Sequence, residues 1–458
     1  MEVAKKLLEK NLPVEALERL KKILYSGNFV DEWRVHDLIG AAFHDLCNAE
    51  GAVQASLSAA ETDKILRSQR IHFSNYLFTL HYLNVDEEII FDAAKVYNSL
   101  YRDVDKSLEL GAWSLKDKIS VAYIAPHFND SSAARFYESL LTDYNREKFF
   151  VTAWSLSNDE DDFTKKIRQN VDGYFNVAEK SFEETAQMIH DNNTDILFDL
   201  GGHTDGGLTL QIAAYKPARV QMSGIGYFDT TGLDAIDFYV TDKFLIDGNE
   251  KFFTENILTL DKLFAFKPNE KMIRAKNFQR TEHDLTFGCL NNFMKITDDY
   301  LNCIRIILEE LSDSKMIFRD TTPLESRRIA LTEKVELAGL PIDRVDIFCG
   351  HDDFFDDYAQ IDLILDTFPY TGGMMTALAL YMGVPVLNLR GKSHSQRIGA
   401  DILRIAELEN FIVNDVDEYI NFAVNFKRRE NFSIAKLLDT ETFVKDFYGK
   451  LEEVINFD

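Results

Sequence analysis

The chain has 458 residues, of which 46% are hydrophobic and 35 are Phe, so more than one packed core and about three domains are expected. Its 76 acidic and 50 basic residues give a formal net charge of −26 at pH 7. A surface this acidic repels polyanions, which argues against nucleic acid and anionic membranes as partners.

The cysteines indicate a reducing compartment. Cys47, Cys289, Cys303 and Cys349 are widely spaced and form no CxxC pair, which argues against a disulfide framework and a structural zinc site. The first residues lack the apolar stretch of a signal peptide, and no run approaches the length of a membrane span. We therefore expect a cytoplasmic protein without a membrane span.

Residues 1–112 have the pattern of an α-helical domain. Strong helix formers dominate, and apolar residues recur at three- and four-residue spacing, as in 16–24. Small residues within 36–42 and 51–60 would let two antiparallel helices approach closely. The segment resembles one or two degenerate tetratricopeptide units, and a plain helical cap on the following domains is the alternative.

The pattern changes after Lys118 to short apolar runs typical of buried parallel strands. These runs lie at 119–124, 149–154, 196–200 and 238–240. Helical stretches separate them, for example at 182–191. Alternation of strand and helix predicts a Rossmann-like, doubly wound domain over 113–270.

A second alternating series follows a polar segment, 267–283, that is typical of a linker. Its strand-like runs lie at 285–288, 314–318, 345–348, 363–365 and 384–389. These runs predict a second Rossmann-like domain over 271–425, so that two α/β domains face a cleft. The stretch from 416 to 456 is expected to be helical, and 426–458 is expected to pack back on the core.

Polar or Gly-rich segments follow four of the expected strands, where open α/β sheets bind ligands. They lie at 125–128, 201–204, 290–295 and 370–373. Gly372 and Gly373 precede an expected helix, so that a phosphate could approach free backbone N–H groups there, and Lys295 could add a positive charge. No GxxxxGK[ST] motif is present, which excludes a P-loop nucleotidase.

These segments also carry a family resemblance. Residues 362–373 (DLILDTFPYTGG) with 380–386 (LYMGVPV) closely resemble the signature of the O-GlcNAc transferase / Spindly family, glycosyltransferases of the GT41 type. Further segments resemble the family in the same order along the chain, at 74–82, 195–204, 217–227, 287–296 and 391–400. The resemblance covers roughly residues 70–425.

The resemblance implies a GT-B enzyme that moves a sugar, with GlcNAc favoured, from a UDP-sugar to Ser or Thr hydroxyls of a protein. It implies no cofactor and no metal, since protein groups can neutralise the leaving diphosphate. The expected catalytic residues are His127, His203 and Lys295. The expected nucleotide-sugar-binding residues are Asn292, Lys295, His351, Phe354, Tyr370, Gly372, Gly373, Met374, Met375, Thr376, His394 and Arg397.

The chain departs from the family pattern inside this site. Met374 and Met375 replace the paired threonines that follow Gly-Gly in relatives, and Leu378 replaces an acidic residue. Phe354 replaces a histidine at the base. After the first strand, His127 stands where relatives have an aspartate, and a serine stands at the place of their histidine.

These departures leave two hypotheses open. In one, backbone amides bind the phosphate, His127 has a polar role in the cleft, and the donor differs from UDP-GlcNAc. In the other, the donor site has decayed and the protein is an inactive GT-B subunit that binds a polypeptide or a partner glycosyltransferase. The acidic run at 352–357 lacks the spacing of an EF-hand, so a solvated helix start is favoured over a metal loop.

Overall fold

A computed structural model of the chain describes residues 1–27, 31–105, 117–276, 283–350, 354–428 and 432–457. The chain forms two compact units, each assembled from separate stretches of sequence. The first-sheet unit comprises Lys64–Phe78, Val85–Lys267 and Leu437–Asp458. The second-sheet unit comprises Met1–Asp63, Thr79–Asn84 and Pro268–Lys436. The expected helical region is thus divided between the units, and the domain boundaries at 112, 270 and 425 stay a prediction.

The first-sheet unit contains a seven-stranded sheet in which all neighbouring strands are parallel. Its strand order is β3-β2-β1-β4-β5-β6-β7. The strands are β1 (Ile119–Ala125), β2 (Phe149–Ser155), β3 (Gly173–Asn176), β4 (Ile196–Asp199), β5 (Val220–Gly224), β6 (Phe238–Asp242) and β7 (Asn256–Leu260). The expected strands are confirmed, whereas β3, β5 and β7 were not expected. Their sequences lack the continuous apolar run of a central strand, since β3 and β7 lie at the sheet edges and β5 carries polar residues.

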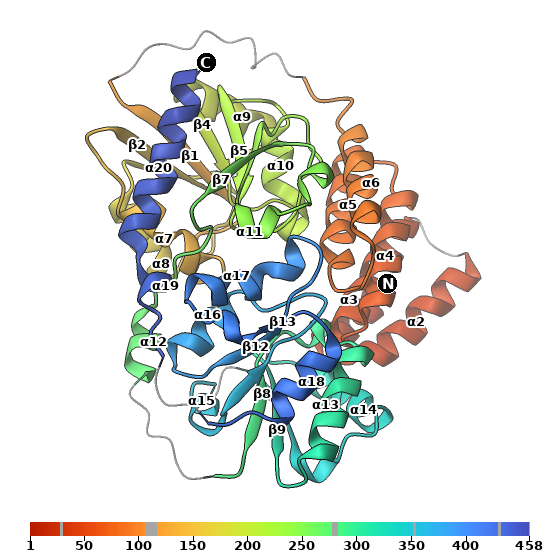
Figure 1. Cartoon of the computed structure of the whole chain (residues 1–458). Helices are drawn as coiled ribbons and strands as arrows, with labels where there is room; N and C mark the ends of the chain where they lie inside the picture. The colour runs from red at the N-terminus through yellow and green to blue at the C-terminus, as the bar shows by residue number, and fades with distance from the viewer. Residues whose placement is uncertain (28–30, 106–116, 277–282, 351–353, 429–431, 458) are drawn as a thin grey trace. The chain divides into compact units, whose positions relative to one another are not determined.

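Helices flank this sheet and complete the unit. They are α5 (Leu66–Leu80), α6 (Glu87–Ser99), α7 (Ala134–Thr142), α8 (Asp162–Asn170), α9 (Phe182–Asp191), α10 (Leu208–Ala213), α11 (Lys243–Ile246) and α20 (Thr440–Phe457). Figure 1 shows α20 across one face, with α9 and α10 on the other. On α20, the Phe447 ring lies 5.3 Å from that of Phe198, and Tyr448 accepts a hydrogen bond from Tyr123 at 3.0 Å. The C-terminal helix therefore packs on β1 and β4.

The second-sheet unit contains a six-stranded parallel sheet with the order β10-β9-β8-β11-β12-β13. Its strands are β8 (Thr286–Cys289), β9 (Lys315–Asp320), β10 (Val345–Cys349), β11 (Leu363–Leu365), β12 (Val386–Leu389) and β13 (Ile412–Val413). The five strands expected here are confirmed, and the two-residue β13 was missed because it is too short to leave a pattern.

The helices that complete this unit differ from expectation in two places. They are α12 (Glu270–Ala275), α13 (Asp298–Glu310), α14 (Glu325–Leu337), α15 (Asp357–Gln360), α16 (Met374–Tyr381), α17 (Ile398–Ile405), α18 (Val416–Val424) and α19 (Ala435–Leu438). The expected linker contains α12, whose first turn is capped by the Asn269 side chain. The expected terminal helix is divided into α18, α19 and α20.

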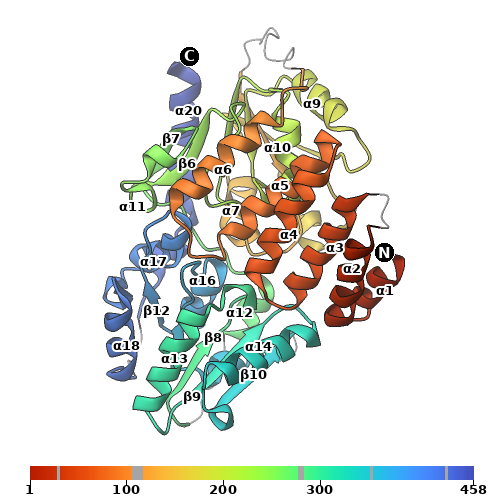
Figure 2. The same ribbon diagram turned by 90° about the vertical axis from the view of Figure 1, so that its right-hand side faces the viewer.

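The first four helices also belong to the second-sheet unit: α1 (Glu2–Glu9), α2 (Pro13–Ser26), α3 (Glu32–Asp45) and α4 (Ala49–Thr62). They share a small core that includes Leu20, Val35 and Ala55. Figure 2 shows α3 and α4 side by side. A Cβ at Gly40 would lie 3.6 Å from the Cβ of Ala55, so small residues do permit the close approach expected from the sequence.

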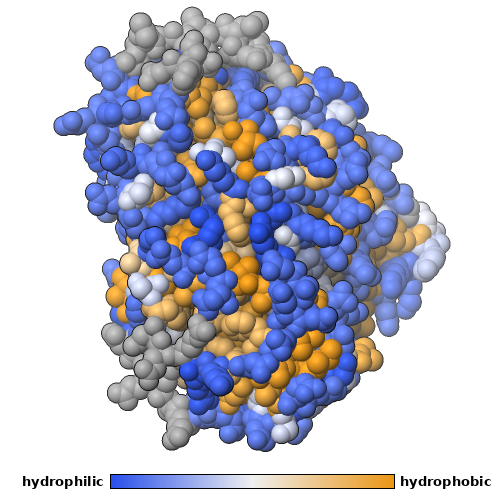
Figure 3. Space-filling view, in the orientation of Figure 1, coloured by the Kyte–Doolittle hydropathy of each residue, from blue (hydrophilic) through white to orange (hydrophobic). Residues whose placement is uncertain are grey.

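Figure 3 shows a face that is mainly hydrophilic and is interrupted by hydrophobic patches. Among the helices that the structure describes, none is long and apolar enough to cross a membrane.

Candidate functional site

The strand orders place the polar segments at the topological switch points of the two sheets. In the second sheet the order reverses between β8 and β11, and the segments 290–295 and 366–373 follow those two strands. In the first sheet it reverses between β1 and β4, and His127 and His203 follow those strands. Ligands of open α/β sheets bind in the crevice at such a point, beyond the carboxyl ends of the strands.

Asp366, at the end of β11, is the anchor of the loop 366–373. Its carboxylate is fully buried and accepts hydrogen bonds from the backbone N–H groups of Gly372 (2.8 Å) and Thr367 (2.9 Å) and the side chains of Asn388 (2.8 Å), Asn291 (3.0 Å) and Thr376 (3.3 Å). Burial raises the pKa of Asp366, and the hydrogen bonds and nearby Lys295 oppose that rise. One carboxylate therefore holds the loop, the start of α16 and the end of β12 together.

The loop leads into α16, which begins as an anion-binding helix would. Gly373 is its N-cap and supplies no side-chain cap. The first N–H groups of a helix have no carbonyl partner within it, and the helix dipole favours negative charge there. Gly373, Met374 and Met375 are half-buried and reach the surface, whereas Thr376 is buried with its hydroxyl on Asp366. Backbone amides, and not the Thr376 hydroxyl, are therefore the groups placed to bind a phosphate.

Lys295 supplies the positive charge at this loop. It ends the short 3₁₀ helix Phe293–Lys295 that follows β8. Its Nζ donates to the Thr371 carbonyl at 2.7 Å and lies 3.8 Å from the centre of the Tyr370 ring. Withdrawal from water lowers the pKa of Lys295 to about 8, although Asp366 acts to raise it. The ammonium is still mostly protonated at pH 7, so it offers a poorly hydrated cation to an anionic ligand.

Other residues of this unit that were expected at the donor site include Asn292, His394 and Arg397. Asn292 caps the Lys295 turn, because its Oδ1 accepts from the Met294 N–H at 2.9 Å. His394 is fully buried, and Arg397 donates from Nε to the Gly391 carbonyl at 3.2 Å.

Of the two residues expected near the base, the structure describes Phe354 alone. Phe354 is buried, with its ring 5.7 Å from that of Tyr358, and its role at the base stays a prediction. His351 lies outside the described residues.

The sequence did not single out two further residues at this loop. Tyr82 packs its ring 5.4 Å from that of Tyr370, and His81 Nδ1 lies 3.1 Å from the Ser395 hydroxyl. Burial raises the pKa of Tyr82 to about 12, so it stays neutral. The family-like segment 74–82 was the signal that could have located them.

His203, in the first-sheet unit, is a buried histidine with both ring nitrogens engaged. Nδ1 lies 2.9 Å from the Ser74 hydroxyl, and Nε2 lies 3.0 Å from the Thr231 carbonyl, which requires the proton on Nε2. Burial lowers its pKa to about 3. In this conformation both nitrogens are engaged, and the contacts join α5 to the segment between β5 and β6.

His127, in contrast, is accessible. Its side chain is 37% exposed, and its Nε2 lies 3.8 Å from the Asp205 carboxylate. Its Nδ1 accepts from the Asn129 N–H at 3.4 Å, a long hydrogen bond. Of the two histidines at the ends of β1 and β4, His127 is therefore the one whose ring can reach a ligand.

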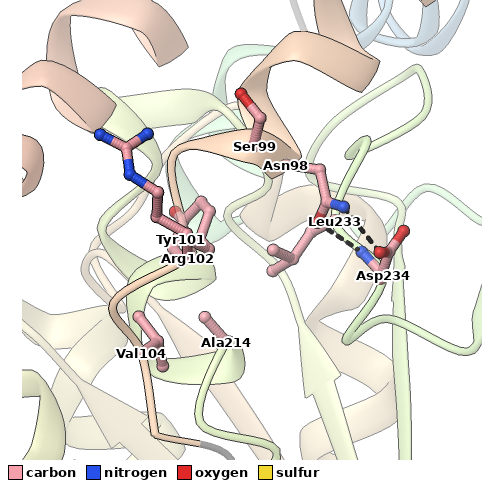
Figure 4. A pocket seen from close by; sticks show the side chains of 8 residues that line it. All are labelled: Asn98, Ser99, Tyr101, Arg102, Val104, Ala214, Leu233 and Asp234. Atoms are coloured by element: carbon pink, nitrogen blue, oxygen red, sulfur yellow. Dashed lines mark hydrogen bonds between the residues drawn. The ribbon is translucent and has the colours of Figure 1, made fainter.

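A hollow of about 320 Å³ in the first-sheet unit is separate from these residues (Figure 4). Its lining comprises Asn98, Ser99, Tyr101, Arg102, Val104, Ala214, Leu233 and Asp234. Asn98 crosses its edge, donating to the Asp234 carboxylate at 2.6 Å. None of the residues expected at the donor or catalytic site lines it.

Within the described part of the chain, no group of three or more His, Cys, Asp or Glu side chains could hold a metal ion. The expectation that neither a metal nor a cofactor is needed stays a prediction.

The chain has a GT-B architecture, in which two parallel-sheet α/β domains follow a helical region. A loop and a helix start suited to a diphosphate lie at a switch point of the second sheet. Residues 109–275 match the model of glycosyl transferase family 41. The chain is thus similar to this family, as its segments at the strand ends suggested. Over 370 residues, or 77% of its length, the chain is 28% identical to a SPINDLY protein of Arabidopsis thaliana. That relative is named a probable UDP-N-acetylglucosamine–peptide N-acetylglucosaminyltransferase.

A SPINDLY protein of Eustoma exaltatum subsp. russellianum is 30% identical over 345 residues, or 69% of this chain. The chain spans 40% and 37% of the lengths of these two relatives. A solved structure of a Thermobaculum terrenum O-GlcNAc transferase mutant superposes with a TM-score of 0.82 at 22% identity, covering 97% of this chain and 87% of that one. The likeness to that structure establishes the GT-B fold.

Proposed function

We propose that the protein is a glycosyltransferase that moves a sugar, with GlcNAc favoured, from a UDP-sugar to Ser or Thr hydroxyls of a protein. The observation that carries this proposal is the Asp366-anchored loop, which sets the open start of α16 beside the Lys295 ammonium. The donor and the acceptor class in this proposal are those in the names of the two plant relatives.

The chemistry required is a displacement at the anomeric carbon. The bond from that carbon to the β-phosphate oxygen breaks, a bond to the acceptor oxygen forms, and UDP leaves with the bonding electrons. The acceptor proton goes to a base or to the departing phosphate. Lys295 and the backbone amides of α16 would stabilise the negative charge that grows on the diphosphate. His127 is the accessible imidazole available for a proton.

The proposal is tested by the binding of UDP and the transfer of labelled sugar to proteins of a lysate. Lys295→Met removes the cation and keeps the side-chain length, so UDP affinity and transfer should both fall at least tenfold. Lys315→Met, at an exposed lysine of β9, is the matched control and should leave both unchanged. Wild-type protein that neither transfers nor hydrolyses UDP- or GDP-sugars, and binds no UDP near millimolar concentration, would refute the proposal.

A second candidate function has an observation of its own. Met374 and Met375 present no hydroxyl at the start of α16, and the Thr376 hydroxyl is committed to Asp366. A GT-B protein with a decayed donor site would instead bind a polypeptide or a partner glycosyltransferase. This second function predicts that the wild type and Lys295→Met both fold and that neither binds UDP.

A further inference from the structure

Arg327, on α14, donates hydrogen bonds to three residues that lie outside its helix. It is 0% exposed. Its Nε and Nη2 donate to Asp320 Oδ2 at 2.9 and 2.6 Å, and Nη2 also donates to Asn292 Oδ1 at 2.5 Å. Its Nη1 donates to the His44 carbonyl at 2.9 Å. The planar guanidinium is the side chain that can serve three acceptors at fixed angles.

Two of these acceptors fix the turn that carries Lys295. Asp320 ends β9, and its Oδ2 also accepts from the Phe293 N–H at 2.9 Å, the first residue of that turn. Asn292 caps the same turn. Arg327 therefore binds both side chains that hold the backbone of the Lys295 turn.

The third acceptor belongs to the end of α3, whose last carbonyls need partners outside the helix. Three side chains of α14 donate to carbonyls at this end or just beyond it. Arg327 binds the His44 carbonyl, the Ser326 hydroxyl binds that of Asp45 at 3.1 Å, and Lys334 binds that of Cys47 at 2.7 Å. The end of α3 is thus docked on the helix that supports the Lys295 turn.

We propose that Arg327 is a positioning residue for Lys295, and that through it the docking of α3 on α14 controls the geometry of the donor site. Loosening the end of α3 removes one acceptor of Arg327, and Asp320 and Asn292 then hold the turn less rigidly. The inference rests on the proposed function in one respect only. If the site binds a sugar donor, the affinity for that donor should depend on the docking of α3.

The test measures Lys295 itself, so it does not depend on donor binding. Competitive acylation across a pH series, with peptides resolved by mass spectrometry, gives the titration of Lys295. In Arg327→Met the released turn should expose the ammonium, and the titration should move upward from about 8 toward the 10.5 of a free lysine. Arg328→Met, at the adjacent exposed arginine paired with Glu325, is the matched control and should leave it in place.

Two further variants keep the test decisive if Arg327→Met does not fold. Arg327→Lys keeps the charge beside Asp320 but cannot reach three acceptors at once, so it should shift the titration partway. The double variant Ser326→Ala, Lys334→Met loosens α3 without touching Asp320 or Asn292 and should shift it in the same direction.

The outcomes separate the two proposals. An unchanged Lys295 titration in folded Arg327→Met or Arg327→Lys overturns the positioning role, and an unchanged titration in the double variant overturns the coupling to α3. UDP affinity measured on the same proteins should fall at least tenfold in Arg327→Met and stay unchanged in Arg328→Met. Absence of UDP binding in the wild type counts against the proposed function alone, because the titration still decides this inference.

Discussion

Two substitutions of Asp366 separate the contribution of its hydrogen bonds from that of its negative charge. In Asp366→Ala the buried N–H groups of Thr367 and Gly372 lose their acceptor. An unsatisfied buried donor costs roughly 2 kcal/mol, so the loop should be destabilised by about 4 kcal/mol. In Asp366→Asn one oxygen remains for these N–H groups. The new amide can face the Asn388 side chain, whose Oδ1 has no hydrogen-bond partner in the described structure and can turn to accept.

The raised pKa of Asp366 shows that its charge is disfavoured by burial, so Asp366→Asn should cost at most about 1 kcal/mol. Hydrogen exchange of the peptide 366–378, followed by mass spectrometry, reports the local opening. A loss of about 4 kcal/mol corresponds to roughly thousandfold faster exchange in Asp366→Ala, and Asp366→Asn should change it less than tenfold. Asp343→Ala, at an exposed aspartate of the same unit, is the control. Wild-type exchange in Asp366→Ala would refute the role of this carboxylate as the anchor.

Three further outcomes are expected. Because the pKa of Lys295 is about 8, its protonated fraction falls about tenfold between pH 7 and pH 9. Calorimetry should therefore show UDP affinity falling by about that factor, whereas Lys295→Met should show no such slope. The pKa of His203 is lowered from 6.5 to about 3, so the unfolded chain takes up the proton first. Stability should therefore be complete above pH 6.5 and fall by up to about 1.4 kcal/mol per unit below it, and denaturant titrations of His203→Gln should lack this dependence. A Cβ in Gly372→Ala would lie 2.4 Å from Thr376 Oγ1 and 2.9 Å from Asp366 Oδ1, so UDP binding should fall more than tenfold in calorimetry; wild-type affinity would contradict this packing.

Local patterns were enough to predict the central strands other than β5. Runs such as 119–124 and 363–365 are buried on both faces of a parallel sheet, and such strands need apolar residues at every position. β5 was missed because Gln221 and Ser223 are polar, and their burial is acceptable only through distant partners. Gln221 donates to the Ala213 and Ala235 carbonyls, and Ser223 donates to Asp199. A sequence pattern does not contain these pairings.

In the candidate site, too, local sequence patterns predicted some features, and others depend on contacts between distant residues. Gly372, Gly373 and Lys295 were expected because glycines before a helix and a lysine after a strand carry a phosphate-binding chemistry of their own. His203 was expected to act in catalysis, and only its contacts with Ser74 and Thr231 show a neutral ring with both nitrogens occupied. Its position after Gly-Gly is the same under either role, so the sequence could not separate them.

The sequence by itself determined the two alternating α/β domains, the helical region before them and the family resemblance, because these depend on short-range periodicity and on contiguous motifs. Tertiary structure decided which loop is anchored, by Asp366, and which helix supports Lys295. Arg327 and His44 are separated by 283 residues, yet one guanidinium joins them. Buried polar groups take whichever partner the packed fold brings within hydrogen-bonding distance, and that choice is made only once the chain has folded.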